Sequence, residues 1–157
     1  MAAPSFLDQA LFTELAEKAA ANPRGRQHHN FHQMEEPCHR IAIGLQPSTY
    51  IPPHRHLSGD KAETLLVLKG QIGVLVFDEA GHVTSKRTLQ AGGETVGVDL
   101  PAKIYHSLVV LEADSVIFEC KAGPYRPVGE GEHAHWAPRE GEPGVAEYQA
   151  WMRAQFD

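Results

Sequence analysis

The first part of the chain carries the pattern of an amphipathic helix. Its apolar residues recur on one stripe of a 3.6-residue repeat. Ser5 and Asp8 stand three residues apart in the manner of a capping box, with Ser5 as the N-cap, and Asn22-Pro23 ends the pattern. The sequence therefore predicts a helical arm over residues about 5–21.

From about residue 38 the pattern changes to short runs rich in Val, Ile, Leu and Thr, separated by Pro, Gly or Asp. Eight such runs on this spacing are typical of a jelly roll or a small barrel, so the fold class is all-β with a barrel over about 38–122. A loop and an amphipathic helix are expected over about 123–157. The predicted strands are His39–Leu45, Tyr50–His56, Glu63–Leu68, Gln71–Phe77, His82–Leu89, Thr95–Val98, Ile104–Val110 and Ser115–Lys121.

Two of these runs, Thr64–Leu68 and Val74–Phe77, are apolar on both faces. One face can fill the barrel, and the other needs cover from a helix or from a second subunit. We therefore expect the terminal helices to pack on the outside of the barrel, and we expect a homodimer. At 157 residues, the chain is predicted to be a single domain over residues 1–157.

Charge and composition narrow the class of partner. The chain has 14 Lys+Arg against 20 Asp+Glu and a net charge of -6, whereas a general nucleic-acid binder has the opposite sign. Neither a signal sequence nor an apolar run of the ~18 residues that a membrane span needs is visible. Cys38 and Cys120 are expected to be thiols. These features predict a cytoplasmic protein with a small-molecule ligand and no nucleic-acid or membrane partner.

Histidine is unusually frequent, with 10 residues, and four positions have the pattern of a metal site. His54 and His56 are one residue apart, so an extended strand directs both imidazoles to one face. Glu63 and His106 each share the parity of the apolar residues in their own strands, which places them on the interior side. Three imidazoles and one carboxylate suit one divalent ion, which could be Fe, Mn, Zn, Ni or Co. The alternative is that these are ordinary surface or core histidines.

Lys61, Tyr105 and Glu119 are the candidate catalytic residues near this group. Glu119 and Lys121 share one face of their strand, and their apolar neighbours share the other, so either set lines the barrel. Inside, Glu119 is a candidate general acid or base, with the lysine to hold it charged. An outward ion pair or dimer contact is the alternative that the sequence favours for this carboxylate.

Two other polar groups have simpler interpretations. His133 and His135 are compatible with metal binding, but they lie in a loop without a third ligand and are expected to be solvated. The polar cluster before the barrel could cap the mouth of a pocket or satisfy buried backbone groups. This cluster consists of His28, His29, Asn30, His32 and Arg40.

Ordered short motifs carry a resemblance to a known family. The stretch from Pro47 to His56, with Glu63 and Gly70 after it, resembles the first cupin motif, and Pro101 to His106 resembles the second. More narrowly, the chain resembles the WbuC family of cupin-fold metalloproteins. The motifs that resemble it are Asn30-Phe31-His32, Pro53-His54-Arg55-His56, Phe77-Asp78, Gly123-Pro124-Tyr125 and Trp136-Ala137-Pro138.

The resemblance implies a cupin double-stranded β-helix with flanking helices and one divalent ion on His54, His56, His106 and Glu63. It also implies an association with bacterial surface polysaccharide (O-antigen) biosynthesis, and hence a small sugar or carboxylate-type molecule. The spacer between His56 and Glu63 is longer than in the general motif. The fold supports several reactions, so an isomerase, a lyase and a dioxygenase stay open. The alternatives are a non-catalytic metal-dependent binding or sensor module and a structural dimer without metal.

Overall fold

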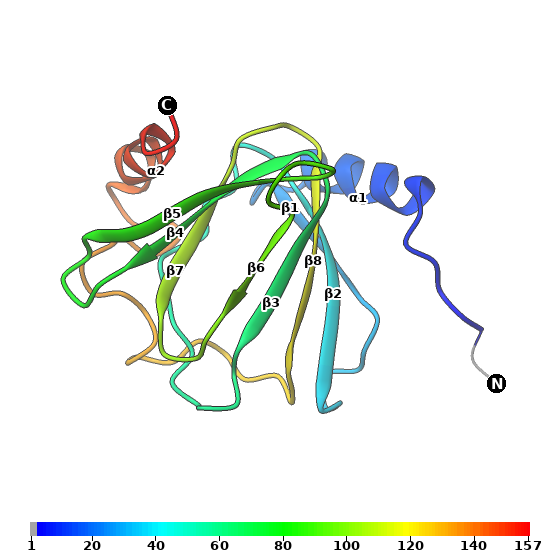
Figure 1. Cartoon of the computed structure of the whole chain (residues 1–157), viewed down its shortest axis with the longest axis horizontal. Coiled ribbons are helices and arrows are strands. Elements are labelled where there is room, and N and C mark those ends of the chain that lie inside the picture. Colours follow the sequence, from blue (N-terminus) through cyan, green and yellow to red (C-terminus); the bar gives the residue numbers. More distant parts are fainter. Residues whose placement is uncertain (1–2) are drawn as a thin grey trace.

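The structure, a computed structural model, describes residues 3–157, and two antiparallel sheets form the centre of the molecule (Figure 1). One sheet has the strand order β1-β2-β8-β3-β6, and the other has the order β5-β4-β7. This is the predicted jelly-roll barrel with a helix near each end of the chain. The strands are β1 (Arg26–Asn30), β2 (Cys38–Leu45), β3 (Glu63–Lys69), β4 (Gln71–Phe77), β5 (Val83–Gln90), β6 (Gly97–Leu100), β7 (Tyr105–Val110) and β8 (Ser115–Ala122).

The core lies between the two sheets and follows the period-2 pattern of the strands. In β3, Leu65 and Val67 are buried, whereas Leu66 between them is 40% exposed. Ile72 of β4 and Val110 of β7 meet them from the other sheet. Burying a side chain of this size contributes about 1.5–3 kcal/mol. This core therefore fixes which face of each strand points inward.

The two helices cover the outside of the barrel, as predicted, and lie at its opposite ends in Figure 1. Helix α1 (Gln9–Ala21) packs on β1 and β2, where Gly44 leaves room for the backbone of Leu15. Helix α2 (Val145–Ala154) buries Met152 on the outer side of the three-stranded sheet. In residues 3–157, no helix has the length and apolar character that crossing a membrane requires.

The start of α1 differs from the predicted capping box. Asp8 is the N-cap: its backbone is extended, and its Oδ1 accepts a hydrogen bond of 2.9 Å from the Leu11 backbone N–H. Ser5 lies before the helix. Phe6 and Leu7, assigned to the apolar stripe by their spacing, are 74% and 44% exposed. The predicted N-cap was wrong because the side chain of Asp8, and not that of Ser5, accepts from a free amide of the first turn.

Two strand predictions also differ from the structure. The stretch Tyr50–His56 forms no strand beyond an isolated bridge at His54, because Pro52 and Pro53 cannot donate backbone hydrogen bonds to a ladder. In contrast, residues Arg26–Asn30 do form a strand, β1, paired with β2. Their polar sequence has no apolar face, which is why the pattern did not predict them.

Candidate metal centre

Three of the four predicted ligands come together at one end of the barrel. One ligand atom from each of His54, Glu63 and His106 lies within 4.8 Å of the other two. Backbone hydrogen bonds of 3.1 and 2.9 Å pair His54 with His106, so the two imidazole centroids are only 4.6 Å apart. Glu63 begins β3 and is 4% exposed. The group could hold one metal ion.

The two imidazoles of this group are oriented by the backbone. Nδ1 of His54 lies 2.9 Å from the carbonyl oxygen of Pro52, and Nδ1 of His106 lies 2.9 Å from that of Ile104. When Nδ1–H donates to a carbonyl, Nε2 is left to coordinate a metal, which is the usual arrangement for histidine ligands. The donor set therefore fits a divalent ion, with two nitrogens and one carboxylate available.

His56 lies beside this group and contacts it through Glu63. Its Nε2 is 2.9 Å from Glu63 Oε1, and Nε2 of His106 is 3.0 Å from Oε2, so each carboxylate oxygen meets one imidazole. On its other side, Nδ1 of His56 lies 3.9 Å from Glu132 Oε2. Glu132 also accepts a hydrogen bond of 2.8 Å from the Leu57 backbone N–H, so it anchors the segment that carries His56. Sequence reasoning did not find Glu132, because it follows His56 by more than seventy positions in an irregular loop.

Glu119 and Lys121 both point into the barrel. Lys121 lies opposite Glu63 in the register of β8 and β3, and its Nζ is 3.4 Å from Glu63 Oε1 and 3.7 Å from Glu119 Oε1. The outward orientation that the sequence favoured for Glu119 is wrong. Ile117 has the same parity and is 2% exposed in the core, so the strand cannot turn its carboxylate outward.

The two carboxylates in the barrel have opposite pKa shifts. Burial raises the pKa of Glu119 to about 7, with the charge of Glu63 adding to the effect and Lys121 opposing it. Burial also acts to raise the pKa of Glu63, but its hydrogen bonds with His106 and His56 outweigh that effect and place it well below the ordinary value. Glu63 is thus ionised, and Glu119 is suited to hold or release a proton near neutral pH.

The structure does not bring the other two candidate catalytic residues to this group. Lys61 donates hydrogen bonds of 2.5 and 3.0 Å to the carbonyls of Ala122 and Pro124, which ties the loop before β3 to the end of β8. Tyr105 lies on the opposite face of β7 from His106. There it packs against Trp136, with the Arg55 guanidinium 4.3 Å from its ring centroid.

A cavity of about 390 Å³ adjoins the three-residue group. Its deep part is apolar, with Ile43, Leu65 and Val74 among the lining residues. Its polar part is lined by the three-residue group and by Glu119 and Lys121. Three further basic side chains also line it: Arg24, Arg26 and His28. Arg24 and Arg26 were not predicted as site residues, although their spacing of two residues from each other and from His28 is a signal that all three lie on one face of an extended segment.

Residues of the polar cluster before the barrel take both of the expected roles, capping the pocket mouth and satisfying buried backbone groups. His28 lines the cavity, in agreement with a role at the pocket mouth. His32 instead satisfies the backbone, because its Nδ1 lies 2.9 Å from the N–H and 3.0 Å from the carbonyl of Arg40.

The pair His133 and His135 is only half solvated. His135 is exposed, but His133 is partly buried and forms a backbone bridge with His54. It lines a hollow of about 350 Å³ next to the cavity, together with His54, Arg24 and Arg26. The expectation of a solvated pair was therefore wrong for His133, because the loop folds back over the mouth of the barrel.

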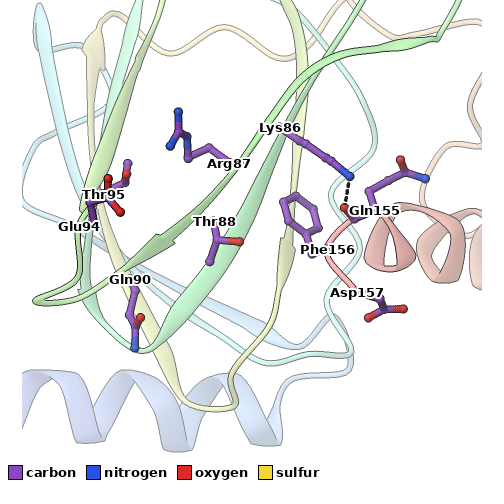
Figure 2. A pocket seen from close by; sticks show the side chains of 9 residues that line it. All are labelled: Lys86, Arg87, Thr88, Gln90, Glu94, Thr95, Gln155, Phe156 and Asp157. Carbon is purple, nitrogen blue, oxygen red and sulfur yellow. Dashed lines mark hydrogen bonds between the residues drawn. The ribbon is translucent and has the colours of Figure 1, made fainter.

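A separate hollow of about 480 Å³ lies on the three-stranded sheet beside the C-terminal end (Figure 2). The side chains of Lys86, Arg87 and Thr88 surround it together with Phe156, and Lys86 donates a hydrogen bond to the carbonyl of Gln155. Its lining contains none of the histidines among the described residues.

Comparison with known proteins assigns the chain to a family whose function is unknown. A family model described as a domain of unknown function (DUF6016) matches residues 7–89, which is more than half of the chain. The chain belongs to this family. No curated protein matches this DUF6016 chain.

Solved structures similar to the DUF6016 chain share its fold. KdgF from Halomonas sp. has a TM-score of 0.52 and 20% identity, over 67% of this chain and 84% of that one. An oxalate oxidase in complex with the substrate analogue glycolate has a TM-score of 0.52 and 16% identity, over 67% and 55%. A conserved protein of unknown function from Streptococcus pyogenes has a TM-score of 0.51 and 13% identity, over 67% and 80%. The shared architecture is that of the cupin fold.

Proposed function

We propose that this protein is a divalent-metal-binding cupin enzyme that acts on a small carboxylate-type molecule. The observation that carries the proposal is the group His54, Glu63 and His106, in which backbone carbonyls orient both imidazoles. When bound, a divalent ion supplies a Lewis acid that polarises an oxygen of the substrate. The resemblance to the WbuC family, the association with O-antigen biosynthesis and a sugar substrate stay predictions.

The other polar side chains of the cavity supply the proton chemistry. Glu119 is the candidate general acid or base, because burial raises its pKa to about 7, close to the value at which a group both gives and takes a proton readily. Lys121 lies between Glu119 and Glu63 and stabilises the charge of either. The apolar floor of the cavity keeps water away from the buried side of the substrate.

The charge and size of the cavity favour a small anion as substrate. Arg24 and Arg26 line it and offer two guanidinium groups to an anion, whereas Lys121, which also lines it, is paired with Glu63 and Glu119. A volume of about 390 Å³ lies near the lower end of the range for small-molecule sites.

One observation favours the alternative, a metal-dependent binding or sensor module without catalysis. Lys61 and Tyr105 are held away from the group, so proton transfer depends on Glu119 and its neighbour Lys121. Turnover of a carboxylate by the metal-loaded protein would exclude this alternative.

The experiment is metal analysis by mass spectrometry of untagged protein purified without a nickel column. We expect close to one divalent ion per chain in the wild type and a large loss in His54→Ala and His106→Ala. His82→Ala is the matched control, since His82 is exposed and contacts Asp78 in a turn. Wild-type protein without metal after reconstitution, or equal metal in all four proteins, would contradict the proposal.

A further inference from the structure

Two arginines at the mouth of the cavity share one carboxylate. Arg24 donates hydrogen bonds of 2.8 and 2.7 Å to the two oxygens of Glu140, and Arg26 donates to the same two oxygens at 3.2 and 2.9 Å. Each guanidinium therefore binds the carboxylate with two parallel hydrogen bonds, the geometry of specific carboxylate recognition.

This arginine pair, Arg24 and Arg26, faces the candidate metal centre. Both side chains line the cavity that contains His54, Glu63 and His106, and both also line the adjoining hollow. The Arg26 side chain is 8% exposed and that of Arg24 is 59% exposed, so the pair extends from the inside of the barrel to the solvent. A ligand that enters the cavity from this side has to pass it.

We propose that the arginine pair binds a carboxylate group of the substrate, and that Glu140 occupies it as an internal substitute when no substrate is present. The proposal rests on the proposed function and names the part of that site which recognises the substrate. The substrate is then a small dicarboxylate or hydroxy acid, with one carboxylate on the arginine pair and a second oxygen donor directed to the metal centre.

The balance of charge supports this exchange. Within the arginine pair, two guanidinium groups face the single carboxylate of Glu140, so the pair carries one positive charge in excess, whereas Lys121 in the same cavity is paired with Glu63 and Glu119. A carboxylate from the substrate can take over the same hydrogen bonds and the same charge pairing as Glu140. Exchange of equivalent partners leaves no arginine buried and unpaired, which would be costly.

The position of Glu140 also supports it. Glu140 lies between β8 and α2, in a part of the chain that forms neither helix nor strand, and its side chain is 34% exposed. An irregular surface segment can move aside at lower cost than a strand of the barrel. Because Glu140 is tethered to the site, it competes with free carboxylates at a high effective concentration.

The test measures binding of succinate to the full chain by isothermal titration calorimetry. Glu140→Gln keeps the shape of the side chain but removes its charge, so we expect succinate to bind about ten-fold more tightly than to the wild type. Binding of the neutral analogue succinamide is expected to stay unchanged. The control is Glu130→Gln, because the Glu130 side chain is 91% exposed and forms its ion pair with Arg139, which lies outside the arginine pair. Adding Arg24→Gln to Glu140→Gln should abolish the gain.

An unchanged succinate affinity in Glu140→Gln would overturn the proposal, as would an equal gain for succinamide. Inorganic phosphate binding more tightly than succinate would overturn the assignment to a carboxylate. Metal content measured on the same samples separates this result from the proposed function. Metal without a gain in affinity rejects the arginine pair alone, whereas a gain without metal supports the pair and rejects the metal-dependent function.

Discussion

At the scale of single residues, the candidate site contains several buried charged side chains, each of which is stabilised by a hydrogen-bonded or oppositely charged neighbour. Arg26, Glu63 and Glu119 would each be costly inside an apolar barrel without a partner. Arg26 has Glu140, and Glu63 has two imidazoles and Lys121. Glu119 has Lys121 at 3.7 Å, and burial raises the pKa of its carboxyl group. The cluster is therefore better explained by function than by stability.

The ion pairs of Glu140 make a pH-dependent contribution to stability. The hydrogen bonds from Arg24, and then those from Arg26, lower the pKa of Glu140 to about 2. A carboxyl with a lowered pKa in the folded state stabilises the fold above its unfolded pKa, and this contribution disappears as the pH falls towards about 2. Since the side chain is one-third exposed, we expect Glu140→Gln to cost only about 1 kcal/mol at pH 7.

Urea denaturation at several pH values checks this expectation. The difference in unfolding free energy between wild type and Glu140→Gln should shrink steadily from pH 5 to pH 2. A difference that stays constant over this range would show that the charge of Glu140 does not account for the effect. Glu130→Gln again serves as the exposed control.

The orientation of a side chain was predicted correctly where the alternation within a single strand decides it. The parity of Glu63 and His106 with their apolar neighbours placed both inside, and the structure agrees. It did not find Arg24 and Arg26, because their role depends on Glu140, which follows Arg26 by 114 positions. The orientation of Glu119 was open for a similar reason, since Ile117 fixes it only once the core has formed.

At the scale of elements, the period of the pattern decided which segments were predicted. Strands with at least one apolar face, such as β4 and β8, were found complete or nearly so. Strand β1 was missed because its inner face lines a polar cavity instead of the core. The stretch Tyr50–His56 was assigned to a strand, but its prolines leave it only isolated bridges from His54 to His106 and to His133.

The beginning of α1 gives a test at this scale. Asp8→Ala removes the side chain that accepts from the Leu11 backbone N–H and should lower the free energy of unfolding by about 1 kcal/mol. Ser5→Ala should leave it unchanged, because Ser5 lies outside the helix. Chemical denaturation of the two variants compares them directly. Equal effects would mean that the helix starts where the capping-box pattern places it.

At the scale of the whole molecule, the candidate metal centre brings together residues from distant parts of the barrel. His54 lies in the proline-containing segment, Glu63 begins β3 and His106 belongs to β7, which is in the other sheet. An ion bound to all three links the two sheets and stabilises only the folded state. The homodimer stays a prediction. Leu66, on the outer face of β3, is 40% exposed and is a residue that a second subunit could cover.

Removing the metal should therefore lower the thermal stability of the whole chain. For an ion present at about 100 times its Kd, mass action gives ~2.7 kcal/mol, or a fall in Tm of roughly 5–10 °C on addition of EDTA. The His54→Ala variant should show a much smaller shift under the same conditions. If EDTA leaves the Tm of the wild type unchanged, no ion links the sheets.

The place of β8 in the middle of the five-stranded sheet limits which insertions and deletions the sequence can accept. It pairs with β2 on one side and β3 on the other, with Ile117 opposite Ile43 and Val67. Inserting or deleting a single codon within β8 would reverse the faces of all residues beyond it, turning Glu119 and Lys121 to the solvent and Phe118 and Cys120 to the cavity. We expect length variation among family members in the loops that flank β8 and not within the strand itself.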